Sequence, residues 1–158
     1  MAQTTTAMSS KNAVVEYSVD GSTWIIISGT ANSVTVSGGS RKTGEAFTAD
    51  GDTPLIVSGK REPLEVTVKA VYTEDAAGTP HAFNGIRAEY VDGTGVAVRW
   101  SPTAYTLINQ KRYTTSDTTN AAAVVCPITS FSYPALDFSS GDPIMIEFTV
   151  KCSAILTA

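Results

Sequence analysis

The sequence predicts a mainly β protein, an antiparallel sandwich or partly closed barrel with one flanking helix and a long loop between two strands. Charged residues make up only 16% of the 158 residues. The abundant Thr, Ser, Val and Ala suit extended strands better than exposed helices. Two long runs alternate between polar and apolar residues, as half-buried strands do, and only one segment has helical spacing.

The length favours a single domain, residues 1–158, which is long enough to bury its own core. We expect an N-terminal arm over about residues 1–12. This segment lacks the basic start and apolar centre of a signal peptide. No later stretch approaches the roughly 20 apolar residues of a membrane helix, so we expect a soluble product that is made in the cytoplasm.

We expect residues 13–18 and 23–28 to form a β-hairpin, because Asp20-Gly21 favours the positive φ angles of a tight turn. Residues 33–37 (SVTVS) alternate, which predicts a strand with one covered face and one solvated face.

Two longer strands are expected over residues 64–73 and 144–152, because both runs alternate strictly. The first run places Leu64, Val66, Val68, Ala70 and Tyr72 on one side, and the second places Ile144, Ile146, Phe148, Val150 and Cys152 on one side.

The only predicted helix covers about residues 80–91. Pro80 is tolerated in a first helical turn, and Phe83, Ile86 and Tyr90 fall at spacings of three and four. Gly93 ends the pattern. We expect this helix to lie across a sheet face or a barrel opening.

Further strands are expected over residues 96–100 and 128–133, with residues 134–143 connecting the second of them to the last strand. Residues 101–121 are polar and rich in threonine, which predicts a second long loop. Tyr105 and Leu107 are its candidate anchors.

The polar sides of the two longer strands have matching sequences. One has Glu65, Thr67 and Lys69, and the other has Glu147, Thr149 and Lys151. Antiparallel pairing would place Glu65 opposite Lys151, Thr67 opposite Thr149, and Lys69 opposite Glu147, each pair contributing roughly 0.2–1 kcal/mol. One interpretation is a chance match on a solvated sheet face. The match also suits a wall that faces a water-filled channel, since paired charges and small hydroxyls leave neither a sticky surface nor a strong field.

The sequence gives little sign of catalytic chemistry, and we predict no enzyme, no cofactor and no metal. His81 is the only histidine and has no ligand cluster near it. Residues 50–52 lack the remaining positions of a calcium loop. Trp24 and Trp100 could form a sugar platform but are better explained as core residues. We expect the two cysteines, Cys126 and Cys152, to remain reduced thiols.

The insert over about residues 38–63 is the unusual feature, because most connections in compact domains take about 4–6 residues. Its flanks are basic and its middle is acidic, with apolar residues between them. Exposed apolar residues usually mark an interaction site. A negative tip and a positive root permit head-to-tail contact between copies. We therefore predict a loop that is ordered only by neighbouring subunits, with these contact residues: Arg41, Lys42, Glu45, Phe47, Asp50, Asp52, Leu55, Ile56, Lys60 and Arg61.

Two runs carry a family resemblance. Residues 43–74 (TGEAFTADGDTPLIVSGKREPLEVTVKAVYTE) and 98–102 (VRWSP) resemble the major tail tube protein of long-tailed, non-contractile bacteriophages, a family related in fold to type VI secretion tube proteins. The likeness extends from about residue 13 to residue 150. It implies six subunits in a ring, stacked rings that form the tail tube, and a loop over residues 41–63 that contacts other subunits.

The resemblance also implies partners: the tape measure protein, a tail terminator, and a baseplate or distal tail protein. The site of action would be the virion tail, assembled in the host cytoplasm, with no membrane involved. A tube that conducts genomic DNA during ejection must not bind it, because each phosphate contact by a basic side chain adds affinity. The formal net charge of −4 agrees with that requirement. We predict that six residues face the lumen: Glu65, Thr67, Lys69, Glu147, Thr149 and Lys151.

A second interpretation is a monomeric β-sandwich binding module of a phage or cell-surface fibre. Residues 16–24 (EYSVDGSTW) support it, since such hairpins are common in extracellular sandwich domains. The long insert and the missing signal peptide argue against it. Assembly into rings or filaments distinguishes the two interpretations.

Overall fold

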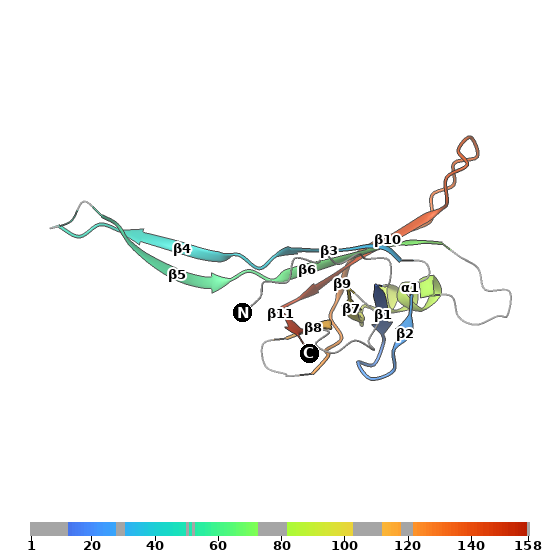
Figure 1. Cartoon of the computed structure of the whole chain (residues 1–158), viewed down its shortest axis with the longest axis horizontal. Coiled ribbons are helices and arrows are strands. Elements are labelled where there is room, and N and C mark those ends of the chain that lie inside the picture. The colour runs from blue at the N-terminus through green and yellow to red at the C-terminus, as the bar shows by residue number, and fades with distance from the viewer. Residues whose placement is uncertain are drawn as a thin grey trace, which may run out of the picture.

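The computed structural model describes residues 13–27, 31–49, 51, 53–72, 82–102, 112–117 and 122–157. In these ranges it has eleven strands and one helix, arranged as a five-stranded sheet, a four-stranded sheet and a two-stranded sheet (Figure 1). All strand pairs are antiparallel. The predicted mainly β class with one helix is confirmed.

The five-stranded sheet contains the predicted N-terminal hairpin. Its order is β11 (Ala154–Thr157), β8 (Tyr113–Ser116), β7 (Ala97–Ser101), β1 (Val14–Ser18) and β2 (Ile25–Ile26). In the turn, Gly21 has a φ of +77°. The Asp20 carboxylate accepts hydrogen bonds from the backbone N–H groups of Thr23 and Ser22 at 2.7 and 2.8 Å, and these bonds lower the pKa of Asp20. Local turn chemistry therefore fixes this hairpin.

The four-stranded sheet has the order β3 (Ala31–Gly38), β6 (Leu64–Val71), β10 (Met145–Cys152) and β9 (Ile128–Ser132). The predicted apolar sides of the two longer strands are buried, except that Tyr72 and Ile144 are half-buried. Most of these side chains form one core with residues of the five-stranded sheet, among them Val15, Tyr17 and Val98. Ala70, Ile146 and Tyr72 belong to a smaller cluster with Phe83. The two sheets thus make a sandwich.

The helix α1 (Ala82–Asp92) agrees with the predicted range over the described residues. Phe83 and Ile86 are buried, and the ring of Tyr90 stacks on Phe131 of β9 with centroids 5.5 Å apart. The helix therefore covers one end of the sandwich next to β9, as expected for a helix on a sheet face. Gly93 follows it with a φ of +74°, as is common just after a helix.

Outside the insert, two strands were not expected. β8 lies inside the predicted loop 101–121, and its polar sequence YTTS has no hydrophobic alternation. Its Thr115 is fully buried, and the hydroxyl oxygen accepts a hydrogen bond from the backbone N–H of Val98 at 2.9 Å. β11 follows β10 after a bend at Ser153 and joins the other sheet. Tyr105 and Leu107 lie outside the described residues.

The insert over residues 38–63 contains more regular structure than the sequence suggested. β4 (Arg41–Ala46) and β5 (Leu55–Arg61) pair with each other as a separate two-stranded sheet, which we call the arm. It projects away from the sandwich (Figure 1). Since the two strands pair within one chain, the expectation that only neighbouring subunits order this segment is corrected.

Candidate functional site

The predicted register of the two longer strands is confirmed. Glu65 pairs with Lys151, Thr67 with Thr149, and Lys69 with Glu147. All six side chains lie on the face of the four-stranded sheet that points away from the core, because their neighbours in each strand are buried.

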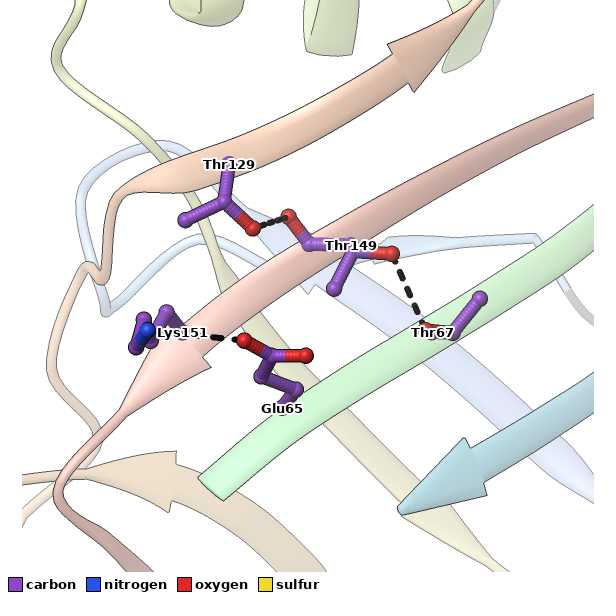
Figure 2. A network of polar contacts seen from close by, with 5 residues as sticks. All are labelled: Glu65, Thr67, Thr129, Thr149 and Lys151. Atoms are coloured by element: carbon purple, nitrogen blue, oxygen red, sulfur yellow. Dashed lines mark hydrogen bonds and ion pairs between the residues drawn. The ribbon is translucent and has the colours of Figure 1, made fainter. Parts of the chain in front are cut away.

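Direct contacts connect four of these six side chains across the strands (Figure 2). Lys151 Nζ lies 3.4 Å from Glu65 Oε1, and the hydroxyl oxygens of Thr67 and Thr149 are 2.9 Å apart. The Thr129 hydroxyl donates to the backbone oxygen of Thr149 at 3.4 Å, next to an irregularity in the β9–β10 register. Both members of the ion pair are more than 40% exposed, so it contributes at most about 1 kcal/mol. Its main effect is to neutralise local charge.

The outer strands extend this surface with hydroxyl groups alone. Ser33, Thr35 and Ser37 of β3 lie opposite Lys69, Thr67 and Glu65, and Ser132 and Ser130 of β9 lie opposite Glu147 and Thr149. We call the eleven residues of these three rows the polar face. It has two lysines, two glutamates and seven hydroxyl side chains, so its formal charge is zero. Val71 and Met145 follow at one end of the same side.

Both borders of the four-stranded sheet are edge strands. β3 and β9 each pair with only one neighbour within the described chain. An edge strand offers unpaired backbone N–H and C=O groups, to which a strand of another chain can bind. The polar face can therefore continue into the sheet of a second copy.

The arm has two different faces, although every residue of both strands is exposed. The register places Gly44 opposite Val57 and Ala46 opposite Leu55, so one face of the outer half of the arm is entirely apolar. The opposite face is mixed, with Thr43, Glu45, Ile56 and Ser58. Leu55 and Val57 are 58% and 63% exposed, which is unusual for such large apolar side chains.

The base of the arm is held by its own hydrogen bonds. Arg61 Nε donates to the backbone oxygen of Gly39 at 3.1 Å, and the N–H of Glu62 donates to Ser40 O at 2.8 Å. Gly38 and Gly39 have φ values of +79° and +76°, and a Cβ at Gly38 would lie 2.5 Å from Pro63 O. These contacts fix how the arm leaves the sandwich.

The structure brings some of the predicted contact residues together. The basic residues Arg41, Lys42, Lys60 and Arg61 meet at the base of the arm, where Arg41 pairs with Arg61. The apolar residues Phe47, Leu55 and Ile56 and the acidic Glu45 lie on its outer half and are exposed. Asp50, Asp52 and His81 lie outside the described residues.

Sequence reasoning missed one exposed region. The connection between β9 and β10 exposes Tyr133, Leu136 and Phe138, and Phe138 is 95% exposed. The apolar residues between Pro134 and Pro143 were the available signal. Elsewhere, the expectation that Trp24 is a core residue is wrong.

Both tryptophans contact residues of the five-stranded sheet. Arg99 Nη2 lies 2.6 Å from Glu16 Oε2, and the guanidinium carbon lies 4.0 Å from the centre of the Trp24 ring. Trp24 therefore makes a cation–π contact, while Trp100 stacks on Tyr113 at 5.8 Å and packs against the core. These contacts leave no sugar platform made of the two indole rings.

The chemical inventory of the described residues is short. Cys126 and Cys152 are buried free thiols, and burial raises the pKa of Cys126 to about 11. Within the described part, no group of three or more His, Cys, Asp or Glu side chains could hold a metal ion. Among the same residues, no helix has the length and apolar character needed to cross a membrane.

Comparisons with solved structures identify the fold. The chain is similar to a chain of the PVC sheath-tube complex of an extracellular contractile injection system, with a TM-score of 0.66 and 15% identity over 99% of both chains. It is also similar to a chain of the anti-feeding prophage tube-terminating cap, with a TM-score of 0.63 and 11% identity over 100% of this chain and 95% of that one. A third similar chain comes from the native gene transfer agent virion, with a TM-score of 0.60 and 11% identity over 99% of both chains.

These similarities are in fold and not in sequence. No family profile matches the chain, and no curated protein matches it. The chain therefore has the fold of subunits found in phage-like tubes and tails. The three neighbours come from a contractile injection system, the anti-feeding prophage and a gene transfer agent, so membership of the non-contractile phage family remains a prediction.

Proposed function

We propose that this chain is the structural subunit of a phage-like tail tube and not an enzyme. Copies join side by side into hexameric rings, the rings stack, and the four-stranded sheet lines the lumen. The main support for the proposal is the polar face. Its opposite charges lie on paired positions of β6 and β10, and its two borders are open edge strands.

The polar face suits a channel for DNA. Binding of DNA depends on basic side chains that neutralise phosphates and release counterions. Here Lys151 contacts Glu65, Lys69 faces Glu147, and the remaining side chains of the face are hydroxyls. A genome can pass such a wall without specific binding.

The arm suits contacts between subunits. Its apolar face is uncovered in the single chain, and heterologous contacts between copies can close into rings or continue into tubes. The predicted contact of the acidic middle of the insert, Asp50 and Asp52, with the basic base of a neighbour is tested below against a second acidic partner. The tape measure protein, tail terminator and baseplate or distal tail protein are the further partners, and the virion tail is the location.

The first test is assembly of the purified chain. We expect rings or tubes by negative-stain microscopy, and a concentration-dependent shift to large species by size-exclusion chromatography. A chain that stays monomeric at millimolar concentration would instead support the fibre binding module.

The second test concerns the lumen. The variant Thr67→Cys places a thiol on the polar face, while the native thiols Cys126 and Cys152 are buried. We expect a bulky polymer-linked maleimide to modify this thiol in monomers and to be excluded from it in tubes. Asp92→Cys, on the exposed end of α1, is the control for general loss of reactivity. Equal modification of Thr67→Cys in monomers and tubes would place the polar face outside the lumen.

A further inference from the structure

The arm and the connection between β9 and β10 project from opposite ends of the four-stranded sheet. Leu64, next to the arm, pairs with Cys152, while Val71 at the other end of β6 pairs with Met145. The connection, residues 133–144, enters β10 at Met145 and therefore lies at the far end (Figure 1). We call it the β9–β10 loop. In a stack of identical rings, opposite ends of the subunit are the surfaces that meet.

The β9–β10 loop presents an aromatic residue beside acidic ones. Phe138 is 95% exposed and Leu136 is 62% exposed. The loop has two acidic side chains, Asp137 and Asp142, and no basic one. A large uncovered aromatic ring next to like charges is typical of a contact surface, since a monomer gains nothing from exposing it.

The loop also has order of its own. The N–H and the hydroxyl of Ser139 donate to Asp137 Oδ1 at 2.9 and 2.6 Å, and the Ser140 hydroxyl donates to Asp142 Oδ2 at 2.7 Å. The Ser139 hydrogen bonds lower the pKa of Asp137, so its charge persists at mildly acidic pH. Docking a preorganised loop loses less conformational entropy than docking a flexible one.

A complementary hollow lies at the base of the arm, and we call it the root pocket. Gly38, Gly59 and Pro63 supply uncharged surface, and six charged residues surround them: Lys42, Lys60, Arg61, Glu62, Glu65 and Lys151. Four of the six are basic and two are acidic. Glu65 contacts Lys151, and Glu62 accepts a hydrogen bond from the Ser40 hydroxyl at 2.9 Å. Lys42 and Lys60 have no ion-pair partner among the described residues, so the pocket has a positive excess.

We propose that the β9–β10 loop of one copy docks into the root pocket of the next copy along the tube. Phe138 rests on the uncharged surface and the aliphatic stems of the basic residues, and Asp137 and Asp142 face Lys42 and Lys60. This inference rests on the proposed tube, and it specifies which surfaces hold successive rings together. A basic side chain over the ring of Phe138 adds a cation–π contact.

The arm tip is the competing acidic partner for the root pocket. In the sequence, Asp50 and Asp52 fall between β4 and β5, the two strands of the arm, and the arm and the pocket lie at the same end of the sheet. Contact between successive rings joins opposite ends, so it brings the β9–β10 loop to the pocket. Charge reversal distinguishes the two partners.

The experiment compares three reversed surfaces in the full chain. Asp137→Lys with Asp142→Lys reverses the loop, Lys42→Glu with Lys60→Glu reverses the pocket, and Asp50→Lys with Asp52→Lys reverses the tip. Asp92→Lys is the control for an exposed acid on α1. We expect the loop or pocket reversal to raise the critical concentration for tube growth by at least about tenfold, because like charges then meet. Combining these two reversals restores growth to within about threefold of wild type.

A disulfide test gives a second readout that does not alter the hydrogen bonds of the loop. In the variant Phe138→Cys with Lys60→Cys, the two thiols lie at opposite ends of one sheet, so oxidation can join them only between copies. We expect a ladder of covalent oligomers from tubes on a non-reducing gel, and no ladder beyond dimers from either single variant.

The outcomes separate this inference from the proposed function. If wild type forms no rings or tubes, the tube proposal fails and the docking inference fails with it. If wild-type tubes grow but the loop reversal and its control behave alike and no ladder forms, only the docking inference is overturned. Rescue of the tip reversal by the pocket reversal, without rescue of the loop reversal, would assign the pocket to the arm tip instead.

Discussion

The sandwich and the arm use similar strands in opposite ways. In β6 every second side chain is buried, and Val66 and Val68 are fully inaccessible. In β5 the run Leu55, Ile56 and Val57 is just as apolar, yet each side chain is at least 58% exposed. The apolar residues of this chain therefore have two roles. Those in the sandwich stabilise the monomer, whereas those in the arm can gain burial only from another chain.

The largest expected effect on stability is the difference between alanine variants of two phenylalanines. Phe148→Ala removes a side chain that is 1% exposed in the core, and we expect a loss of about 3–5 kcal/mol in the free energy of unfolding. Phe138→Ala changes a side chain that is 95% exposed, and we expect a change within about 0.5 kcal/mol. Urea unfolding measures both. Similar losses would show that the β9–β10 loop is part of the folding unit.

A smaller effect is expected where the helix meets the five-stranded sheet. A Cβ at Gly85 would lie 2.7 Å from the hydroxyl oxygen of Tyr17, which is 1% exposed. Gly85→Ala should therefore destabilise the chain by about 1–3 kcal/mol, although alanine is the better helix former. Thermal and urea unfolding provide the measurement.

Two variants control for this result. Asn84→Ala changes an exposed position of the same helix and should be neutral or slightly stabilising. Tyr17→Phe with Gly85→Ala removes the hydroxyl that causes the clash, so the loss should be smaller than the sum of the single losses. A stabilising Gly85→Ala would mean that helix and sheet are packed more loosely than the structure shows.

The sequence predicted the sandwich where burial leaves a periodic pattern. Strict alternation in residues 64–73 and 144–152 identified both the strands and their buried sides, and the order of Glu, Thr and Lys on the polar side identified the register. Hydrophobic periodicity could not identify β8, because Thr114, Thr115 and Ser116 are buried polar residues. The hydrogen-bond partners of Thr115 and Ser116, Val98 and Ala122, lie outside the strand itself, so a local pattern does not contain them.

The arm was recognised as an unusual segment, but not as a hairpin. Glycines at 38, 39, 44 and 59 resembled a loop, whereas in the structure Gly38 and Gly39 serve the bend at the base of the arm. Gly44 lies within β4, and a Cβ at Gly59 would lie 2.9 Å from Lys42 O, so close strand approach explains that glycine. The apolar and acidic residues of the β9–β10 loop were visible in the sequence. Its position opposite the arm, on which its proposed role depends, comes only from the structure.

Substitutions in the arm should have the smallest effect on stability and a large effect on assembly. Leu55→Ser with Val57→Ser changes two side chains on the apolar face of the arm, both already exposed, so the free energy of unfolding should change by less than about 0.5 kcal/mol. Ring and tube formation should be lost, because burial of these side chains against another copy supplies apolar contact area. Ile56→Ser, on the opposite face, is the matched control and should assemble more readily than the double variant. Urea unfolding tests the predicted stability, and microscopy of the same samples tests the predicted loss of assembly. A loss above about 1 kcal/mol would show that the arm stabilises its own sandwich, and normal tubes would show that its apolar face is not a subunit contact.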